Sequence, residues 1–559
     1  MSATVASPVL GASPGLISPG NIFYFLLVPA LILWYAYWKL SRRHMEELAA
    51  KIPGVPGYPL IGNALEFTGT SHAIFDNLVT KSKNLGRVLK VWIGHKLMVF
   101  LMDPDDIELV LSSHEHIDKA EEYRLFEPWF GNGLLISTGA KWRAHRKLIA
   151  PTFHLNVLKS FVDLFNVNSL QVVEKLNKTI GKEIDCHDYM SEATVEILLE
   201  TAMGVSKKTQ GQSGYDYAMA VMKMCDIIHL RHTKLWLYPD IIFNFTKYKD
   251  YQNKLLGTIH GLTRKVVKSK KAAFAQGIRG SIAEVPEEFK TKISDKTEAK
   301  TVVEGLSFGQ SAGLKDDLDV DDDVGEKKRM AFLDLLIEAS QSGVVINDEE
   351  IKNQVDTIMF EGHDTTAAGS SFFLCMMGAH PDIQDKVMEE LDEIFKGSDR
   401  PVTFADTLEM KYMERCLMET LRKYPPVPLI ARQLRRDLKL ASSDLVVPAG
   451  CTVAIPTFRV HRLPEIYPNP DKFDPDNFLP ERTANRHYYA FIPFSAGPRS
   501  CVGRKYAMLK LKILLSTLMR NFRVISDVPE DEYKLQGDII LKRADGFRIK
   551  LVPRKKAAA

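Results

Sequence analysis

The sequence predicts a mainly α-helical protein with a small β part, preceded by one N-terminal transmembrane helix. Three observations lead to this prediction: an apolar run near the N-terminus, a proline-free stretch from residue 347 to 379, and a helical pattern directly after Cys501. The chain has 559 residues, of which 45% are hydrophobic, so it can bury a large core.

The apolar run near the N-terminus indicates a membrane anchor. Residues 1–38 carry no charged side chain, Ile22–Trp38 is unbroken and apolar, and Lys39, Arg42 and Arg43 follow it. An apolar run with aromatic residues at its end and positive charges behind it is typical of a single span whose charged flank faces the cytosol. A cleaved signal peptide is the alternative, but its positive charges would precede the apolar run.

We therefore expect four parts along the chain: an uncharged tail (1–20), the anchor (21–40), a Pro/Gly hinge (41–60) and one large domain (61–559). Prolines at 53, 56 and 59 exclude a helix through the later part of the hinge. Within the large domain, residues 277–325 are rich in small and charged side chains and include a run of aspartates. Such a segment favours a solvated loop, with a docking surface as the alternative.

Charge and cysteine usage exclude two classes of function. The net charge is +3 without a long basic run, so nucleic acid is not an expected partner. The six cysteines lie tens of residues apart and form no CxxC pair, so neither a zinc site nor a disulfide framework is indicated. The pattern is typical of a protein in a reducing compartment in which a single cysteine has a functional role.

Short strands and many helices are expected in the large domain. Arg87–Leu101 reads as a strand, a turn at Gly94 and a second strand, and Leu445–Ile455 reads as a hairpin. Residues 155–275 alternate helical patterns with short breaks. Asn347 and Glu350 can form a capping box at the start of the proline-free stretch, which would then be a helix about 50 Å long.

The segment Phe494–Gly503 predicts a site built on Cys501. A thiol that precedes a helix start meets backbone N–H groups and the positive end of the helix dipole, and both lower its pKa. Gly497 and Gly503 would allow turns that a side chain would obstruct, and Arg499 could neutralise an acidic group above the loop. A lone cysteine would read as a buried structural residue, but the pattern around this one favours a metal ligand.

Phe494, Gly497, Arg499, Cys501 and Gly503 resemble the haem-binding loop of the cytochrome P-450 superfamily, the haem-thiolate monooxygenases. The resemblance implies the cytochrome P-450 fold, haem b (iron protoporphyrin IX) as cofactor and Cys501 as the ligand of its iron. A thiolate ligand pushes electron density onto the iron and favours O–O cleavage.

Further residues match propionate contacts of that superfamily. Trp142 and Arg146 are four residues apart, so they share one helix face and can bind a carboxylate through an indole N–H and a guanidinium. The resemblance implies that this pair holds a haem propionate, and it places Arg432 as another propionate contact.

The middle of the long helix, Phe360–Thr366, resembles the oxygen-activating segment of the superfamily. Thr365 is expected to deliver protons to the bound dioxygen, with Asp364 as its partner in a relay from water. A packing threonine beside a solvent-facing aspartate is the alternative. Small residues such as Gly362 would let the backbone approach the flat ring.

Glu361 departs from the general superfamily pattern and resembles family 4, in which this glutamate can form an ester with a haem methyl group. A buried carboxylate that faces the ring is otherwise costly, so an ester through Glu361 is our hypothesis.

Glu419 and Arg422 are three apart on a helix that Pro425 ends, and can pair. The resemblance makes them a buried structural lock. In the family an arginine usually joins this pair as the third member of a hydrogen-bond network. This chain has Asn477 at that position, so the sequence leaves open whether the network has a third member. Basic residues of two helices could form a patch on the cysteine side of the haem, at which an acidic electron donor would dock. A solvated helix face is the alternative. The patch would comprise Arg143, Lys147, Arg504, Lys505, Lys510 and Lys512.

The insertion and the Phe360–Thr366 segment together resemble the insect G subfamily of family 4. The resemblance implies an enzyme of the endoplasmic reticulum membrane that converts long-chain fatty aldehydes to hydrocarbons and CO2, with electrons from NADPH through NADPH–cytochrome P-450 reductase. Fatty acid ω-hydroxylation is the alternative reaction. A non-catalytic haem protein that binds a ligand, and an isomerase that needs no reductase, are alternatives of other classes.

Overall fold

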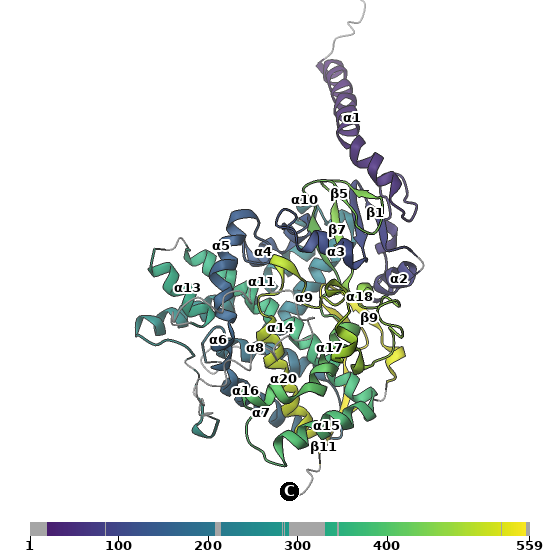
Figure 1. Ribbon diagram of the computed structural model, residues 1–559. Coiled ribbons are helices and arrows are strands. Elements are labelled where there is room, and N and C mark those ends of the chain that lie inside the picture. The colour runs from purple at the N-terminus through teal and green to yellow at the C-terminus, as the bar shows by residue number, and fades with distance from the viewer. Residues whose placement is uncertain are drawn as a thin grey trace, which may run out of the picture.

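In the computed structural model, a long helix projects from a large, mainly helical body (Figure 1). The structure describes residues 19–554, except for 84, 207–213, 282, 284, 290–329, 344–345 and 527. Most of the predicted acidic insertion at 277–325, and nearly all of the predicted tail at 1–20, lie outside these residues.

The helices of the body begin and end as follows: α2 (Ser71–Lys83), α3 (Pro104–Leu111), α4 (Glu127–Phe130), α5 (Gly139–Ile149), α6 (Leu155–Lys159), α7 (Val162–Asn177), α8 (Cys186–Glu200), α9 (Gly214–Thr233), α10 (Asp240–Phe243), α11 (Lys247–Ala275), α13 (Phe332–Gln341), α14 (Asp348–Ala379), α15 (Pro381–Phe395), α16 (Phe404–Glu409), α17 (Lys411–Lys423), α18 (Thr457–Val460), α19 (Pro480–Thr483) and α20 (Arg504–Asn521).

The strands are short: β1 (Val88–Ile93), β2 (Lys96–Leu101), β3 (Glu183–Asp185), β4 (Ile430–Gln433), β5 (Leu438–Lys439), β6 (Val446–Val447), β7 (Thr452–Ile455), β8 (Phe522–Ile525), β9 (Leu535–Gly537), β10 (Leu541–Arg543) and β11 (Arg548–Pro553). This confirms a mainly α fold with a small β part.

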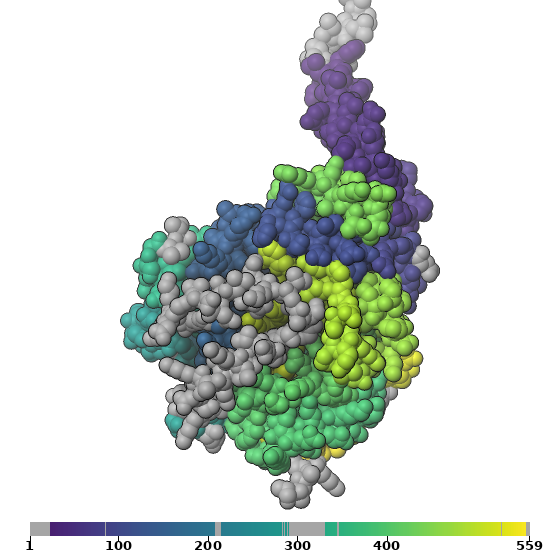
Figure 2. All heavy atoms as spheres, in the orientation of Figure 1, coloured from purple at the N-terminus to yellow at the C-terminus, as the bar shows by residue number. Residues whose placement is uncertain are grey.

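The N-terminal part of helix α1 (Pro19–Lys51) projects from the body (Figure 2), whereas its C-terminal end packs on the body, where Ala49 is buried. Its segment Phe23–Lys51 is long and apolar enough to cross a membrane, and none of the apolar window is buried against the body. The helix continues to Lys51, so the first part of the expected hinge, 41–51, is helical. The proline-rich part that follows is not a loose tether, because Lys90 N–H donates to Pro53 O at 2.8 Å.

Helix α14 runs through the middle of the body (Figure 1) and packs against α8, α11, α15, α17 and α20. The predicted capping box is present: the Asn347 side chain accepts from Glu350 N–H, and the Glu350 side chain accepts from Asn347 N–H. This arrangement satisfies backbone donors that the first turn leaves without partners. The helix start was therefore predictable from the sequence to within one residue.

The largest sheet has the strand order β1-β2-β7-β4. Strands β1 and β2 pair antiparallel around Gly94, as predicted. The predicted hairpin over 445–455 is wrong, because β6 pairs with the preceding strand β5 while β7 pairs with β2 and β4. Gly450, with φ +78°, turns the chain between the two sheets. Strand β4 carries Arg432 into the interior of the protein.

Candidate cofactor site

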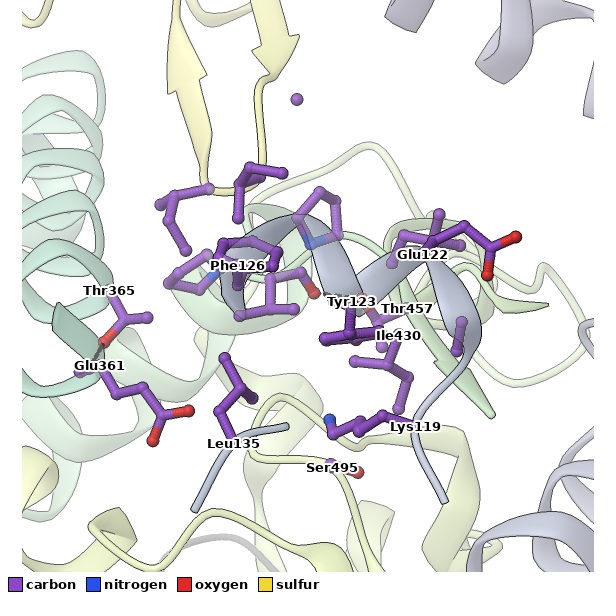
Figure 3. A pocket seen from close by; sticks show the side chains of 18 of the residues that line it. Lys119, Glu122, Tyr123, Phe126, Leu135, Glu361, Thr365, Ile430, Thr457 and Ser495 are labelled. Carbon is purple, nitrogen blue, oxygen red and sulfur yellow. Dashed lines mark hydrogen bonds between the residues drawn. The ribbon is translucent and has the colours of Figure 1, made fainter. Parts of the chain in front are cut away.

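A cavity of about 750 Å³ lies between the Cys501 loop and helix α14. Its lining includes Phe494, Cys501, Trp142, Glu361 and Thr365, which sequence analysis singled out from three separate segments. Glu361 and Thr365 reach into the cavity from α14, and Lys119 reaches toward it from the opposite side (Figure 3). The fold thus brings the predicted residues to one place.

The loop before Cys501 is held by backbone contacts. Cys501 N–H donates to Phe494 O at 2.8 Å. Gly497 has φ +68°, and a Cβ atom there would lie 2.0 Å from Leu111 O, so only glycine fits. Gly503 differs from its prediction: its φ is −95°, and nothing lies within 4 Å of the position of a Cβ atom.

The protein alone does not make Cys501 a thiolate. Burial and the negative charge of Glu361 raise the pKa of the thiol to about 11, against the smaller opposite effects of the Gly503 N–H and of Arg146 and Arg504. The expected lowering by the helix start is therefore outweighed by desolvation. A bound metal cation would supply the missing stabilisation of the charge, because thiols deprotonate when they coordinate metals.

Arg499 braces the chain segment above the Cys501 loop. Its Nε donates to Ile117 O at 3.0 Å, its Nη1 donates to Leu134 O and Leu135 O at 3.3 and 3.2 Å, and its Nη2 donates to Ser137 O. Its guanidinium carbon lies 4.5 Å from the centre of the Trp142 ring. Burial and neighbouring cations lower the pKa of Arg499 to about 9.

Trp142 and Arg146 project from α5 into the cavity, as their spacing predicts. Both side chains are buried. Arg146 Nη1 donates to Ser500 O at 2.8 Å, which ties α5 to the residue before Cys501. The pair therefore stands beside the cysteine, with an indole and a guanidinium at the cavity wall.

The buried Arg432 and the partly buried Lys119, which lines the cavity, complete a group of basic side chains. Arg432 is 1% exposed, and its Nη2 atom has no hydrogen-bond partner among the described residues. Burial and the charges of Arg432 and Arg499 hold the pKa of Lys119 well below its ordinary value. Lys119 was missed by sequence analysis, since nothing in its local sequence distinguishes it from a surface lysine.

On α14, Glu361 and Thr365 line the cavity one turn apart. Thr365 Oγ1 donates to Glu361 O at 2.7 Å. Burial raises the pKa of the Glu361 carboxyl to about 7, even though Lys119, Arg146 and Arg499 act in the opposite direction. The carboxyl of Glu361 at the cavity wall therefore has a pKa near neutral pH.

Asp364 does not line the cavity. It is fully buried, and its Oδ1 lies 2.9 Å from Lys542 Nζ on β10. Burial raises the pKa of Asp364, but Lys542, His363 and His187 together bring it below its ordinary value. The carboxylate next to Thr365 is therefore ionised and bound to a lysine that sequence analysis did not identify.

The structural lock lies behind the Cys501 loop. The Glu419 carboxylate and the Arg422 guanidinium form two hydrogen bonds of 2.7 Å, and both side chains are fully buried. Asn477 occupies the third place, because its Nδ2 lies 3.2 and 3.4 Å from the two Glu419 oxygens. An amide can therefore take part in this network without adding charge.

The expected basic patch is wrong for three of its members. Arg504 is 4% exposed, Lys510 is 0% exposed and Lys512 is 2% exposed, so these side chains of α20 face the interior. Lys510 follows Tyr506 by one helical turn, and Tyr506 is itself buried. That spacing could have shown that Lys510 lies on the buried side.

These residues fit an iron porphyrin. Cys501 would offer the iron a ligand, and Gly497 lets its loop lie close to Leu111. The basic side chains of Lys119, Arg146 and Arg499, which line the cavity, and of the buried Arg432 would face the propionates. The partnerless Arg432 Nη2 atom is a specific sign of such an anion, because buried donors are otherwise almost always paired.

The cysteine site and the helical fold define a haem-thiolate protein, and the comparison with known families agrees. The model of the family Cytochrome P450 matches residues 52–551, and the chain belongs to this family. Within it the chain is a member of family 4. It is 61% identical to cytochrome P450 4g15 of Drosophila melanogaster, over 98% of this chain and 99% of the relative.

Two further relatives also match along nearly their whole length. Cytochrome P450 4g1 of Drosophila melanogaster is 51% identical over 99% of this chain and 96% of its own length. Cytochrome P450 4V2 of Homo sapiens is 35% identical over 97% of this chain and 95% of its own length. The family uses haem iron, so the chain is a P450 monooxygenase, with an N-terminal helix consistent with membrane anchoring.

Proposed function

We propose that this P450 converts long-chain fatty aldehydes to hydrocarbons by oxidative decarbonylation, as its resemblance to the insect G subfamily implies. The observation that carries the proposal is the long apolar cavity, which extends from Cys501 to the hairpin of β1 and β2 on the side of the anchor. Its volume lies in the usual range for small-molecule sites, and most of its wall is hydrophobic.

The far end of the cavity supports a lipid substrate. It is lined there by Ile93, His95 and Leu235, and Arg42 of α1 donates to His95 O. The segment that follows Leu235 carries exposed apolar side chains, among them Trp236, Ile241 and Phe245. An apolar surface beside a membrane anchor favours contact with the bilayer. A substrate that hardly dissolves in water would then enter from the membrane of the endoplasmic reticulum, with the body on the cytosolic side.

The reaction balances with one molecule of dioxygen. An aldehyde RCHO, O₂, two electrons and two protons give RH, CO₂ and H₂O; the bond between the chain and its carbonyl carbon breaks, and the aldehyde carbon is oxidised. NADPH supplies the electrons, through NADPH–cytochrome P-450 reductase. The haem supplies the oxygen chemistry when it is bound.

The residues of this chain hold and orient the reactants. Cys501 would bind the iron, and Trp142, Arg146, Lys119 and Arg432 would hold the propionates. Thr365 stands at the cavity wall, where its hydroxyl can pass a proton to an oxygen atom. Asp364 can act only through a rearrangement or a water molecule, because its carboxylate is bound to Lys542 on the far side of Thr365.

Product analysis tests the proposed reaction. The purified full-length protein is incubated with the reductase, NADPH and a long-chain aldehyde labelled at its carbonyl carbon. We expect labelled CO₂ and an alkane shortened by one carbon. A hydroxylated chain that keeps the label would instead establish ω-hydroxylation. Product formation that does not need NADPH would indicate an isomerase, and binding without product would indicate a haem protein that only holds its ligand.

The ester between Glu361 and the haem is a further part of the proposal. The position of Glu361 supports it, because this carboxyl faces the cavity and forms no ion pair with any of the residues that the structure describes. Acid–acetone extraction should leave haem bound to the wild-type protein, as seen by intact mass, and release all of it from Glu361→Gln. Complete release from the wild type would contradict the ester.

A further inference from the structure

A buried lysine connects the helix of the cysteine ligand with the helix that carries Thr365. Lys510 lies on α20, which begins three residues after Cys501, and its side chain is 0% exposed. Its Nζ donates to Gly362 O and to Thr366 Oγ1, each at 2.8 Å. Both acceptors belong to the turn of α14 that contains Thr365.

The contact between Lys510 and α14 is a pair of hydrogen bonds and not an ion pair. Among the described residues, no carboxylate lies within ion-pair distance of Lys510 Nζ, while its neighbour on the helix, Lys512, pairs with Glu414. Burial lowers the pKa of Lys510 to about 7. A neutral amine still has two N–H donors, which match the two acceptors, so the contact holds on either side of that pKa.

Two adjacent threonines in the turn that Lys510 contacts bond back to the preceding turn. Thr365 Oγ1 donates to Glu361 O at 2.7 Å, and Thr366 Oγ1 lies 2.9 Å from Gly362 O. Threonines that bond back to the preceding turn loosen and bend a helix. Gly362 adds backbone freedom to the same turn. The two hydrogen bonds from Lys510 hold this turn from outside the helix.

Lys510 does not touch the cavity, although both of its acceptors belong to residues that line it. Lys510 can therefore affect the cavity only through the residues that it contacts. We propose that Lys510 is a positioning residue, which ties α20 to the Gly362–Thr366 turn of α14 and thereby sets the place of Thr365 relative to Cys501. The role proposed for Thr365 matters only for the second of the two readouts below.

The test compares Lys510→Met with Lys512→Met in the full-length haem protein. Both variants remove a buried amino group from the same helix, and that of Lys510 donates to Gly362 O and Thr366 Oγ1 of α14. Lys512 donates to Thr407 O at 2.7 Å and pairs with Glu414, so its loss leaves a largely buried acid, 15% exposed, without this cation. Lys512→Met should therefore lower the melting temperature more than Lys510→Met does.

The first readout is hydrogen exchange in peptides that cover 358–370, relative to peptides of α8. We expect Lys510→Met to speed this relative exchange roughly tenfold, because a charge-assisted contact of the turn is lost. Lys512→Met should leave the ratio unchanged. An unchanged ratio in Lys510→Met, or the same increase in both variants, would overturn the proposal.

The second readout is the share of NADPH electrons that appears as peroxide instead of product. It should rise roughly threefold or more in Lys510→Met and stay unchanged in Lys512→Met, because small displacements of a positioned group lower the productive fraction. If the wild type gives no product from any lipid, the proposed function fails while the exchange experiment still decides this inference.

A variant on the other side of the contact covers the case in which Lys510→Met does not fold. Thr366→Val keeps the shape of Thr366 but removes one acceptor of Lys510. It should raise the exchange of 358–370 in the wild-type background, and by much less in the background of Lys510→Gln. Equal effects in both backgrounds would show that the two residues do not act together.

Discussion

Arg422 and Glu419 form a bidentate ion pair, and both side chains are fully buried. The guanidinium also donates to three backbone carbonyls, of His461, Pro470 and Lys472, at 3.0, 2.8 and 3.1 Å. The Glu419 carboxylate accepts from Asp474 N–H at 2.8 Å. The pair thereby joins α17 to the chain that leads to the Cys501 loop.

Arg422→Met should destabilise the protein by about 3–5 kcal/mol, because it leaves the buried Glu419 carboxylate without its cation. Thermal unfolding and haem content measure this effect. Arg415→Met is the matched control on the same helix, since Arg415 pairs with Asp476 at 3.0 Å but Asp476 is half exposed. It should cost less than about 1 kcal/mol. Equal losses in the two variants would contradict the buried lock.

Gly497→Ala should prevent the Cys501 loop from closing, because the added Cβ atom would meet Leu111 O at 2.0 Å. We expect haem content to fall several-fold, measured as haem absorbance per protein. Gly139→Ala separates strain from collision, since Gly139 has φ +56° but nothing within 4 Å of its Cβ position. It should cost only the left-handed backbone penalty, about 1–2 kcal/mol. Normal haem content in Gly497→Ala would refute the close approach.

Lys542→Met should lower the free energy of unfolding by an amount that depends on pH. In the wild type the folded-state pKa of Asp364 lies below its ordinary value, so the carboxylate contributes stability above pH 3.8 and loses it as the pH falls through the folded-state pKa. Without Lys542, burial raises this pKa instead. The loss at pH 7 should be about 3–5 kcal/mol and should shrink toward pH 5, as Asp364 takes up a proton.

Melting temperatures between pH 5 and 8 measure this dependence. The double variant Lys542→Met with Asp364→Asn serves as control, because it has no buried charge at this place and its difference from the wild type should not shrink in the same way. A loss in Lys542→Met that is constant across this range would show that Asp364 stays ionised without the lysine.

Several parts of the site could be predicted because they depend on local spacing. Trp142 and Arg146 share a face by helical periodicity, and Glu361 and Thr365 share another. The capping box of Asn347 and Glu350 marked the start of α14. The loop of Cys501 was recognised from five residues in one short segment. In each case the relevant geometry is determined by neighbours in the sequence.

The remaining parts depend on contacts between distant segments. Only the packing of the chain brings Lys119 to the cavity that Glu361 lines and Lys542 into contact with Asp364, and single lysines carry no local signal. Strand β7 pairs with β2, far away in the sequence, so the expected hairpin with β6 could not be excluded in advance. The pKa of Cys501 was misjudged because the helix start was visible in the sequence while the amount of burial was not.

The central claim is that Cys501 binds the haem iron, and the spectrum of the reduced protein with carbon monoxide tests it most directly. We expect the wild type to give the red-shifted Soret band of a thiolate-bound haem, and Cys501→Ser to lose this band together with NADPH-dependent turnover. A wild-type protein without haem, or a Cys501→Ser protein with the same Soret band and full turnover, would contradict the account.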